Sequence, residues 1–201
     1  MRHAVRHSPP SAVRRQLMLS LALGAALTPL GRVQAQSGGL TLEFRGQSYL
    51  HRWSKANQHE FTPPADTDLS TWRDMLTINI HDRVSNGEDL AEVANRVVGN
   101  YQKNGKILQT RSVPRTAARA AEHLIVAVLG RPDFLEATFA RCVLIEGTGL
   151  VAVCSHRVYG KAAGPAMSDW LSRQGGAVET AWMAWDRWPK LAVLKRLTNK
   201  A

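Results

Sequence analysis

The sequence contains few of the features that most often identify where a protein works or what it does. Its 201 residues include only two cysteines, Cys142 and Cys154. Neither lies near the N-terminus, so a lipid-anchored N-terminal cysteine is not expected. The longest apolar stretch, from Leu17 to Leu30, is shorter than the about 20 residues that a membrane-spanning helix needs. We therefore expect no transmembrane segment in the mature chain.

The chain also lacks the motifs of common enzymes. It has no G-x-S-x-G nucleophile elbow, and no pair of carboxylates stands out. Ser155 and His156 are adjacent in a stretch with strand character, so their side chains are expected to point to opposite faces. The segment GTGLVA at 147–152 matches G-x-G-x-x-A, but strand sequence follows it where a dinucleotide site needs a helix. We predict no cofactor, and a hydrolase of unknown type is only a third hypothesis.

The first 35 residues have the pattern of a cleaved signal peptide. Four arginines in the first 15 residues precede the apolar stretch, and Val33 and Ala35 match the small-x-small pattern of a signal-peptidase site. The pattern predicts cleavage after Ala35, export to the periplasm, and a mature single domain of residues 36–201. The adjacent Arg14 and Arg15 leave two export routes open, an ordinary secretory signal and a twin-arginine signal.

Removing this segment changes the charge balance. Five of the 26 basic residues and none of the 16 acidic residues lie in 1–35. The mature chain therefore carries 21 basic against 16 acidic residues, a net charge of +5. Nucleic-acid binding is expected to leave a clustered basic footprint, and so modest an excess predicts that nucleic acid is not the partner.

Strands are predicted on both sides of one long helix. Alternating and β-branched residues indicate a strand at 40–46, a hairpin at 49–61 and a strand at 72–82. A strand at 106–115 and a three-stranded meander at 122–160 follow the helix. The turns of the meander are too short to hold a crossover helix, so its strands are antiparallel.

The helix between these strands has recognisable ends. Ser85 and Glu88 form an S-x-x-E capping box, and apolar residues then recur at helical spacing. Asn104-Gly105 is expected to end the helix in the left-handed conformation.

The predicted order of strands, helix, strands and helix indicates an α+β domain. We expect a mainly antiparallel sheet of about six to seven strands with two main helices packed on it. The segments DMLTINIHD (74–82) and NGEDLAEVANRVVGNYQKNGKILQ (86–109), together with the meander, resemble the PsbP-like fold of small exported or lumenal α/β/α sandwich proteins. That resemblance implies a binding or assembly role, because proteins of that fold mostly act as such subunits.

The hairpin YLHRWSKANQHEF concentrates histidine and aromatic side chains. Three turns are possible. A turn at 54–56 sets His51 opposite His59, and a turn at 55–56 sets His51 opposite Glu60. The third turn, at 55–57, is favoured because Asn57 tolerates the left-handed conformation that a three-residue turn needs.

The favoured register sets three pairs opposite each other: Trp53 and His59, His51 and Phe61, Arg52 and Glu60. Tyr49, His51, Trp53 and His59 then share one face, which is a candidate small-ligand site. His59 and Glu60 point to opposite faces of a strand, so they cannot bind one ion together. Zinc needs three or four protein ligands and the hairpin offers two at most, so no metal site is predicted.

The two cysteines are a disulfide candidate in an exported protein. A three-residue turn with Gly149 in the left-handed conformation sets Cys142 directly opposite Cys154. A two-residue turn at Gly147-Thr148 would place them on opposite faces. The sequence leaves both a bridge and two buried thiols open.

The C-terminal region is rich in tryptophan. Residues 167–188 are predicted to be helical with a break at Gly175-Gly176, and residues 190–201 to form a frayed tail. The tryptophans here are too closely spaced for all of them to face one core. Trp185 or Trp188 is therefore a candidate contact for a protein partner, since aromatic residues are enriched in interfaces. The alternative is a wide apolar helix face that caps the sheet.

Two functions from different classes follow from these features. The leading hypothesis is an exported, non-enzymatic protein that binds a protein partner, as an assembly factor or an immunity protein does. The rival hypothesis is a small-ligand or metal-binding module that uses the face with His51 and His59. The sequence does not indicate the oligomeric state.

Overall fold

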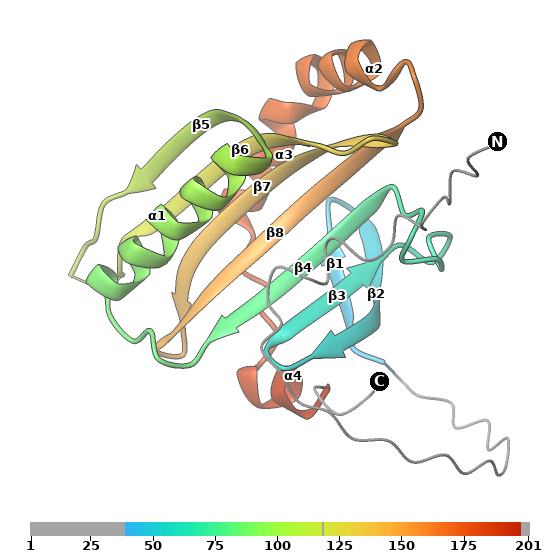
Figure 1. Ribbon diagram of the computed structural model, residues 1–201. Coiled ribbons are helices and arrows are strands. Elements are labelled where there is room, and N and C mark those ends of the chain that lie inside the picture. Colours follow the sequence, from blue (N-terminus) through green and yellow to red (C-terminus); the bar gives the residue numbers. More distant parts are fainter. Residues whose placement is uncertain (1–38, 118, 198–201) are drawn as a thin grey trace, which may run out of the picture. The chain divides into compact units, whose positions relative to one another are not determined.

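The computed structural model describes residues 39–117 and 119–197, which belong to one compact unit spanning Gly39–Ala201 (Figure 1). An eight-stranded antiparallel sheet forms its centre, in the order β1-β2-β3-β4-β8-β7-β6-β5. The strands are β1 (Thr41–Phe44), β2 (Gln47–Lys55), β3 (Gln58–Thr62), β4 (Asp74–His81), β5 (Gly105–Val113), β6 (Glu122–Gly130), β7 (Phe134–Ile145) and β8 (Thr148–Tyr159). The helical elements are α1 (Gly87–Asn104), α2 (Ala163–Trp170), the π-helical turn η3 (Leu171–Gly175), α3 (Gly176–Ala184) and α4 (Leu191–Leu197).

The predicted α+β class with a mainly antiparallel sheet is confirmed, but the expected six to seven strands were too few. The short strand β1 pairs with β2 along its whole length and counts as a separate strand. The first four strands and the last four each form a meander. The two meanders meet where β4 pairs with β8.

The sheet carries one apolar cluster on each face because side chains alternate along its central strands. On β7, Ala137 and Phe139 belong to the cluster under α2, α3 and α4, whereas Ala140 and Cys142 belong to the cluster under α1. In Figure 1, α1 passes in front of β6 and β7, and α3 passes behind β7. Among the described residues, no helix is long and apolar enough to cross a membrane.

Helix α1 begins one residue later than the capping box predicted. Asn86 is the N-cap, and its Oδ1 accepts hydrogen bonds from the amides of Glu88 and Asp89 at 2.9 and 3.0 Å. Asn is as good an N-cap as Ser, so the shift costs little.

Helix α1 ends where predicted, but not through the predicted left-handed glycine. Gly105 is extended, with φ of 176°, and it starts β5 directly. A Cβ atom at this position would lie 2.1 Å from the Val128 carbonyl oxygen. The glycine is therefore needed for close backbone approach and not for a left-handed turn.

The C-terminal region is more ordered than predicted. Gly175 and Gly176 both have right-handed helical angles, so the helix continues through the π-turn η3 into α3, and the predicted break is wrong. The predicted frayed tail is also wrong over 191–197, because α4 buries Leu191, Leu194 and Leu197 in the core. Residues 198–201 and the predicted signal peptide, with its cleavage site, lie outside the described residues.

Candidate functional site

The β2–β3 hairpin has a different register from the favoured one. Its turn is the two-residue Ala56-Asn57, with Ala56 at φ of 50°, and Lys55 pairs with Gln58. The predicted pair of His51 and Phe61 is present, and a bulge follows it at Arg52. The bulge adds one residue to β2, which lets the strand reach the shorter turn.

Two of the three predicted hairpin pairs change as a result. Trp53 lies opposite Glu60 rather than His59, and Ser54 lies opposite His59. Because neighbours on β3 point to opposite faces, Trp53 is on the other side of the sheet from His59.

Arg52 does not pair with Glu60. Its guanidinium donates to Thr62 Oγ1 and to the carbonyls of Pro63 and Pro64, at 3.0 to 3.2 Å. The bulge turns Arg52 out of the ladder toward the loop that follows β3, which explains why a regular register placed it wrongly.

On the hairpin face that contains His59, three polar side chains are linked in series by hydrogen bonds. His51 Nε2 lies 2.7 Å from Ser54 Oγ, which lies 2.8 Å from His59 Nδ1. Tyr49 is on the same face and is buried, and this burial raises the pKa of its hydroxyl. The structure thus brings together three of the four predicted ligand-binding residues, and Trp53 is the one left out.

His59 is the innermost of these three side chains. Its exposed fraction is 0%, and burial, together with the nearby His51, lowers its pKa to about 4. Its Nε2 is buried and has no hydrogen-bond partner among the described residues. The described part of the chain contains no group of three or more His, Cys, Asp or Glu side chains that could hold a metal ion. His59 is a neutral, inward-facing side chain.

The two cysteines do not meet. The β7–β8 turn is Glu146-Gly147, both with positive φ, so Cys142 lies opposite Val151 and Cys154 opposite Phe139. This two-residue turn differs from the three-residue one that would have aligned the thiols. The cysteines belong to the clusters on opposite faces, and both are free and buried. Burial raises the pKa of both thiols, that of Cys142 to about 12.

The tryptophans of the C-terminal region pack on one another. The rings of Trp182 and Trp185 stack at 5.1 Å, and Trp188 meets Trp185 edge-on at 4.6 Å. Trp185 is buried, and its Nε1 donates to the Glu43 carbonyl at 2.8 Å. Trp188 is half-buried, so of the two predicted partner contacts it is the one that reaches the surface.

A buried arginine links this cluster to the sheet. Arg141 on β7 is 1% exposed, and its guanidinium donates to Glu122 Oε2 at 2.8 Å and to the carbonyls of Trp182 and Trp185 at 2.7 Å each. These carbonyls lie at the end of α3, where a cation is favourable. Burial lowers the pKa of the Arg141 guanidinium, and the Glu122 carboxylate opposes this shift.

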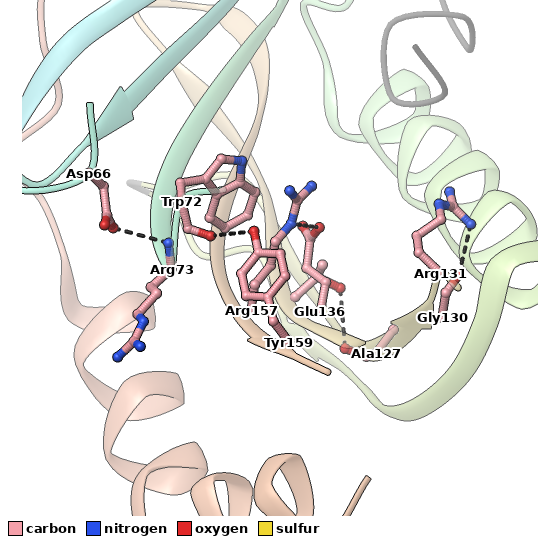
Figure 2. A network of polar contacts seen from close by, with 10 residues as sticks. Asp66, Trp72, Arg73, Ala127, Gly130, Arg131, Glu136, Arg157 and Tyr159 are labelled. Atoms are coloured by element: carbon pink, nitrogen blue, oxygen red, sulfur yellow. Dashed lines mark hydrogen bonds and ion pairs between the residues drawn. The ribbon is translucent and has the colours of Figure 1, made fainter. Parts of the chain in front are cut away.

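A second buried ion pair lies on the other face of the sheet (Figure 2). Arg157 Nε is 2.9 Å from Glu136 Oε2, directly across β7 and β8. The guanidinium carbon is 3.8 Å from the centre of the Trp72 ring and 4.0 Å from that of Phe134. Tyr159 donates to the Trp72 carbonyl at 2.8 Å, which ties the β3–β4 loop to β8. The pair and its aromatic neighbours hold β7, β8 and the β3–β4 loop together.

One carboxylate–histidine pair is nearer the surface. His156 Nδ1 lies 2.8 Å from Asp74 Oδ1, and the imidazole stacks on Trp170 at 4.1 Å with an interplanar angle of 4°. An Asp–His pair orients the base of a hydrolase only when a nucleophile completes it. No Ser, Thr or Cys side chain among the described residues hydrogen-bonds His156. The pair joins β4, β8 and α2.

Two surface hollows of the described chain lie away from the hairpin face. The larger, about 420 Å³, lies between β1 and the end of α3 and is lined by Phe44, Arg45, Ala181, Trp185 and Arg187 among others. A smaller hollow of about 90 Å³ lies beside Trp188. Neither is lined by His51, Trp53 or His59.

The two edges of the sheet differ sharply in how they are covered. The β1 edge buries every second residue. The β5 edge is exposed at seven of its nine positions, on both of its faces. It pairs only with β6, so its outer side presents backbone groups to solvent. The strand itself was predicted, but its place at the edge depends on β4 pairing with β8, which the sequence did not indicate.

The β5 edge is also basic. From Val93 to Ala121 the sequence has no acidic residue. It has six basic residues there, of which Lys106 and Arg111 lie on β5 itself: Arg96, Lys103, Lys106, Arg111, Arg115 and Arg119. Leu108 on this strand is 45% exposed and is the one exposed large hydrophobic residue of the described chain. Sequence reasoning missed this local concentration because it averaged charge over the whole mature chain.

A scan of the sequence against protein-family models gives no match, and a search of curated proteins gives none either.

Proposed function

We propose that this chain is exported to the periplasm and that its domain is a non-enzymatic binding protein for a protein partner. The observation that carries the proposal is the β5 edge, which is exposed at seven of its nine positions, lies in a basic stretch, and bears the exposed Leu108. A long uncovered edge strand is a ready template for pairing with another chain, and proteins that do not use one usually cover it. Trp188, which is half-buried, is a second candidate contact.

The histidine-rich hairpin supports the rival ligand-binding function less well. His59 and Tyr49 are buried, and Ser54 bridges the two histidines. Trp53 lies on the opposite face from them. The face that was to hold a ligand is therefore packed into the domain, and only the half-buried His51 lies toward its surface.

The proposal also includes export of the chain and a PsbP-like fold. The N-terminal pattern supports export and cleavage after Ala35, and the resemblance in residues 74–82, 86–109 and 122–160 supports a PsbP-like sandwich. Expression of the full chain in a Gram-negative host should yield a periplasmic product whose N-terminal residue is Gln36. A product that stays in the cytoplasm with residues 1–35 intact would contradict export.

Capture from an envelope extract tests the binding function. The wild-type chain should retain one protein in a fixed ratio, and a variant with Lys106→Glu and Leu108→Asp should lose it. His51→Ala is the matched control, because it alters the hairpin and leaves β5 intact. Loss on His51→Ala with retention by the β5 variant would favour the rival function instead.

A further inference from the structure

We propose that the β5 edge binds its partner by strand addition. An acidic, extended segment of the partner protein pairs with Gln109–Val113 and extends the sheet by one strand. This inference rests on the proposed function and names the mode and chemistry of the contact.

The backbone geometry of β5 supports this mode. The register shift between Ile107 and Gln109 places a bulge at Leu108, and bulges often protect sheet edges. From Gln109 to Val113, however, the pairing with β6 is regular over five residues. In an antiparallel pair, every second residue directs its N–H and C=O away from its neighbour. This half of β5 therefore offers an ordered row of donors and acceptors.

Three side chains of this edge already have partners within the domain. On the side facing α3, Glu179 accepts from Gln109 Nε2 at 3.2 Å and pairs with Arg111 at 3.2 Å. On the opposite side, Ser112 Oγ lies 2.8 Å from His123 Nδ1 on β6. These contacts orient three of the same five residues, Gln109, Arg111 and Ser112. A pre-ordered edge loses less conformational freedom on binding, which favours affinity.

Charge decides which partner this edge fits. The ion pairs of the basic stretch are those of Arg96, Arg111 and Arg119 with nearby glutamates. Lys103, Lys106 and Arg115 form none with the described residues, and they flank Gln109–Val113 at both ends. An acidic strand would be attracted by this surface. A second copy of β5 would bring like charges together, which disfavours self-pairing.

Hydrogen exchange on the 15N-labelled chain, followed by NMR, tests the proposal with defined probes. The acidic probe is an octapeptide of alternating threonine and glutamate, and the control has lysine in place of glutamate. In the free protein, alternate amides of residues 109–113 should exchange fast. At an acidic-peptide concentration of ten times its Kd those amides should slow about tenfold. The lysine peptide should bind more weakly, and added salt should weaken the acidic peptide.

Adjacent proline variants supply an internal control. Of Thr110 and Arg111, one directs its N–H to β6 and the other directs it outward. Proline at the outward position should keep the fold and abolish binding of the acidic peptide. Proline at the inward position should destabilise the sheet. Arg111→Ala removes the charge but keeps the backbone N–H, so its effect on peptide binding measures the contribution of the charge alone.

Other outcomes of these experiments would overturn strand addition or assign the β5 edge to a different occupant. Binding of the acidic peptide without slowing of the β5 amides would overturn strand addition, as would protection confined to residues 47–62. A dimer whose β5 amides are already protected would assign the edge to a second copy. A single-stranded oligonucleotide that binds more tightly and displaces the peptide would assign it to nucleic acid.

The proposed function can fail separately. If the wild-type chain captures no protein from the envelope extract, the binding function itself fails. If it captures a protein that the outward-facing proline variant still retains, the binding function stands and strand addition fails.

Discussion

At the scale of single residues, several buried polar groups of this domain are paired across strands or with the end of a helix. Arg141 and Arg157 each meet a buried glutamate, and Ser54 bridges two histidines. A buried polar group without a partner costs free energy, whereas a paired one fixes how elements meet. We infer that these groups set the packing of the domain, and two of them give measurable consequences.

His59 should make the domain less stable in acid. Its pKa of about 4 in the folded state lies below its ordinary value near 6.5. The unfolded chain therefore takes up a proton that the folded chain does not, and the free energy of unfolding falls as the pH drops from about 7 to 4. Integrated over this range, the loss from His59 is up to about 3 kcal/mol. Urea unfolding of the wild type and of His59→Asn, at several pH values, measures it.

His59→Asn keeps an amide that can bond Ser54 but removes the titrating ring. Carboxylates affect both proteins equally, so they cancel in the difference. Burial also lowers the pKa of His81 and of His123, so some pH dependence should persist in the variant. Identical pH dependence of the two proteins would show that His59 is not neutral and buried as described.

Arg141 should be among the most sensitive positions in the chain. Arg141→Met removes the buried partner of Glu122, which keeps only the exposed Arg119, and it frees the carbonyls at the end of α3. We expect the free energy of unfolding to fall by about 3 kcal/mol, because a buried carboxylate loses its buried counter-charge. Adding Glu122→Gln to this variant should recover part of the loss.

The exposed pair of Arg173 and Asp169 on η3 and α2 is the matched control. Arg173→Ala should change the free energy of unfolding by no more than about 1 kcal/mol. Equal effects of Arg141→Met and Arg173→Ala in the same urea titration would contradict the role given to Arg141.

At the scale of elements, the C-terminal helices close one face of the sheet. Helix α4 is short, and isolated helices of its length are marginal in water. It is held by Leu191, Leu194 and Leu197, which reach the core below the sheet. Its contribution to stability is therefore one of packing and not of helix propensity.

Leu194→Ala tests whether α4 is part of the core. Leu194 is 0% exposed, so its truncation should lower the free energy of unfolding by about 2–5 kcal/mol. Arg196→Ala, on the exposed side of the same helix, should stay within about 0.5 kcal/mol of the wild type. If thermal and urea unfolding give similar small changes for both, residues 191–197 are a frayed tail after all.

The sequence predicted the elements better than it predicted their registers. Hydrophobic alternation and turn residues located the strands and α1, because these signals are local. Whether Ala56-Asn57 or a longer turn closes the first hairpin depends on the bulge at Arg52. The turn at Glu146-Gly147 likewise decided that Cys142 and Cys154 lie on opposite faces. A shift of one residue reverses every side chain, so small turn differences changed the candidate sites most.

At the scale of the whole molecule, pairing between distant segments determines the binding surface. The crossover through α1 lets β4 pair with β8, and this leaves β5 at the outer edge. No local pattern within residues 105–113 indicates that position. The sequence did not predict the buried ion pairs either, because Glu122 and Arg141 are brought together only by the β6–β7 ladder.

The proposed function depends most on β5 being the partner-binding edge. Hydrogen exchange of the chain with and without the protein it captures from an envelope extract tests this most directly. We predict slowed exchange concentrated in residues 105–113 and absent from the hairpin at 47–62. Slowing confined to the hairpin or to the surface around Trp188, with β5 exchanging as in the free chain, would contradict the account.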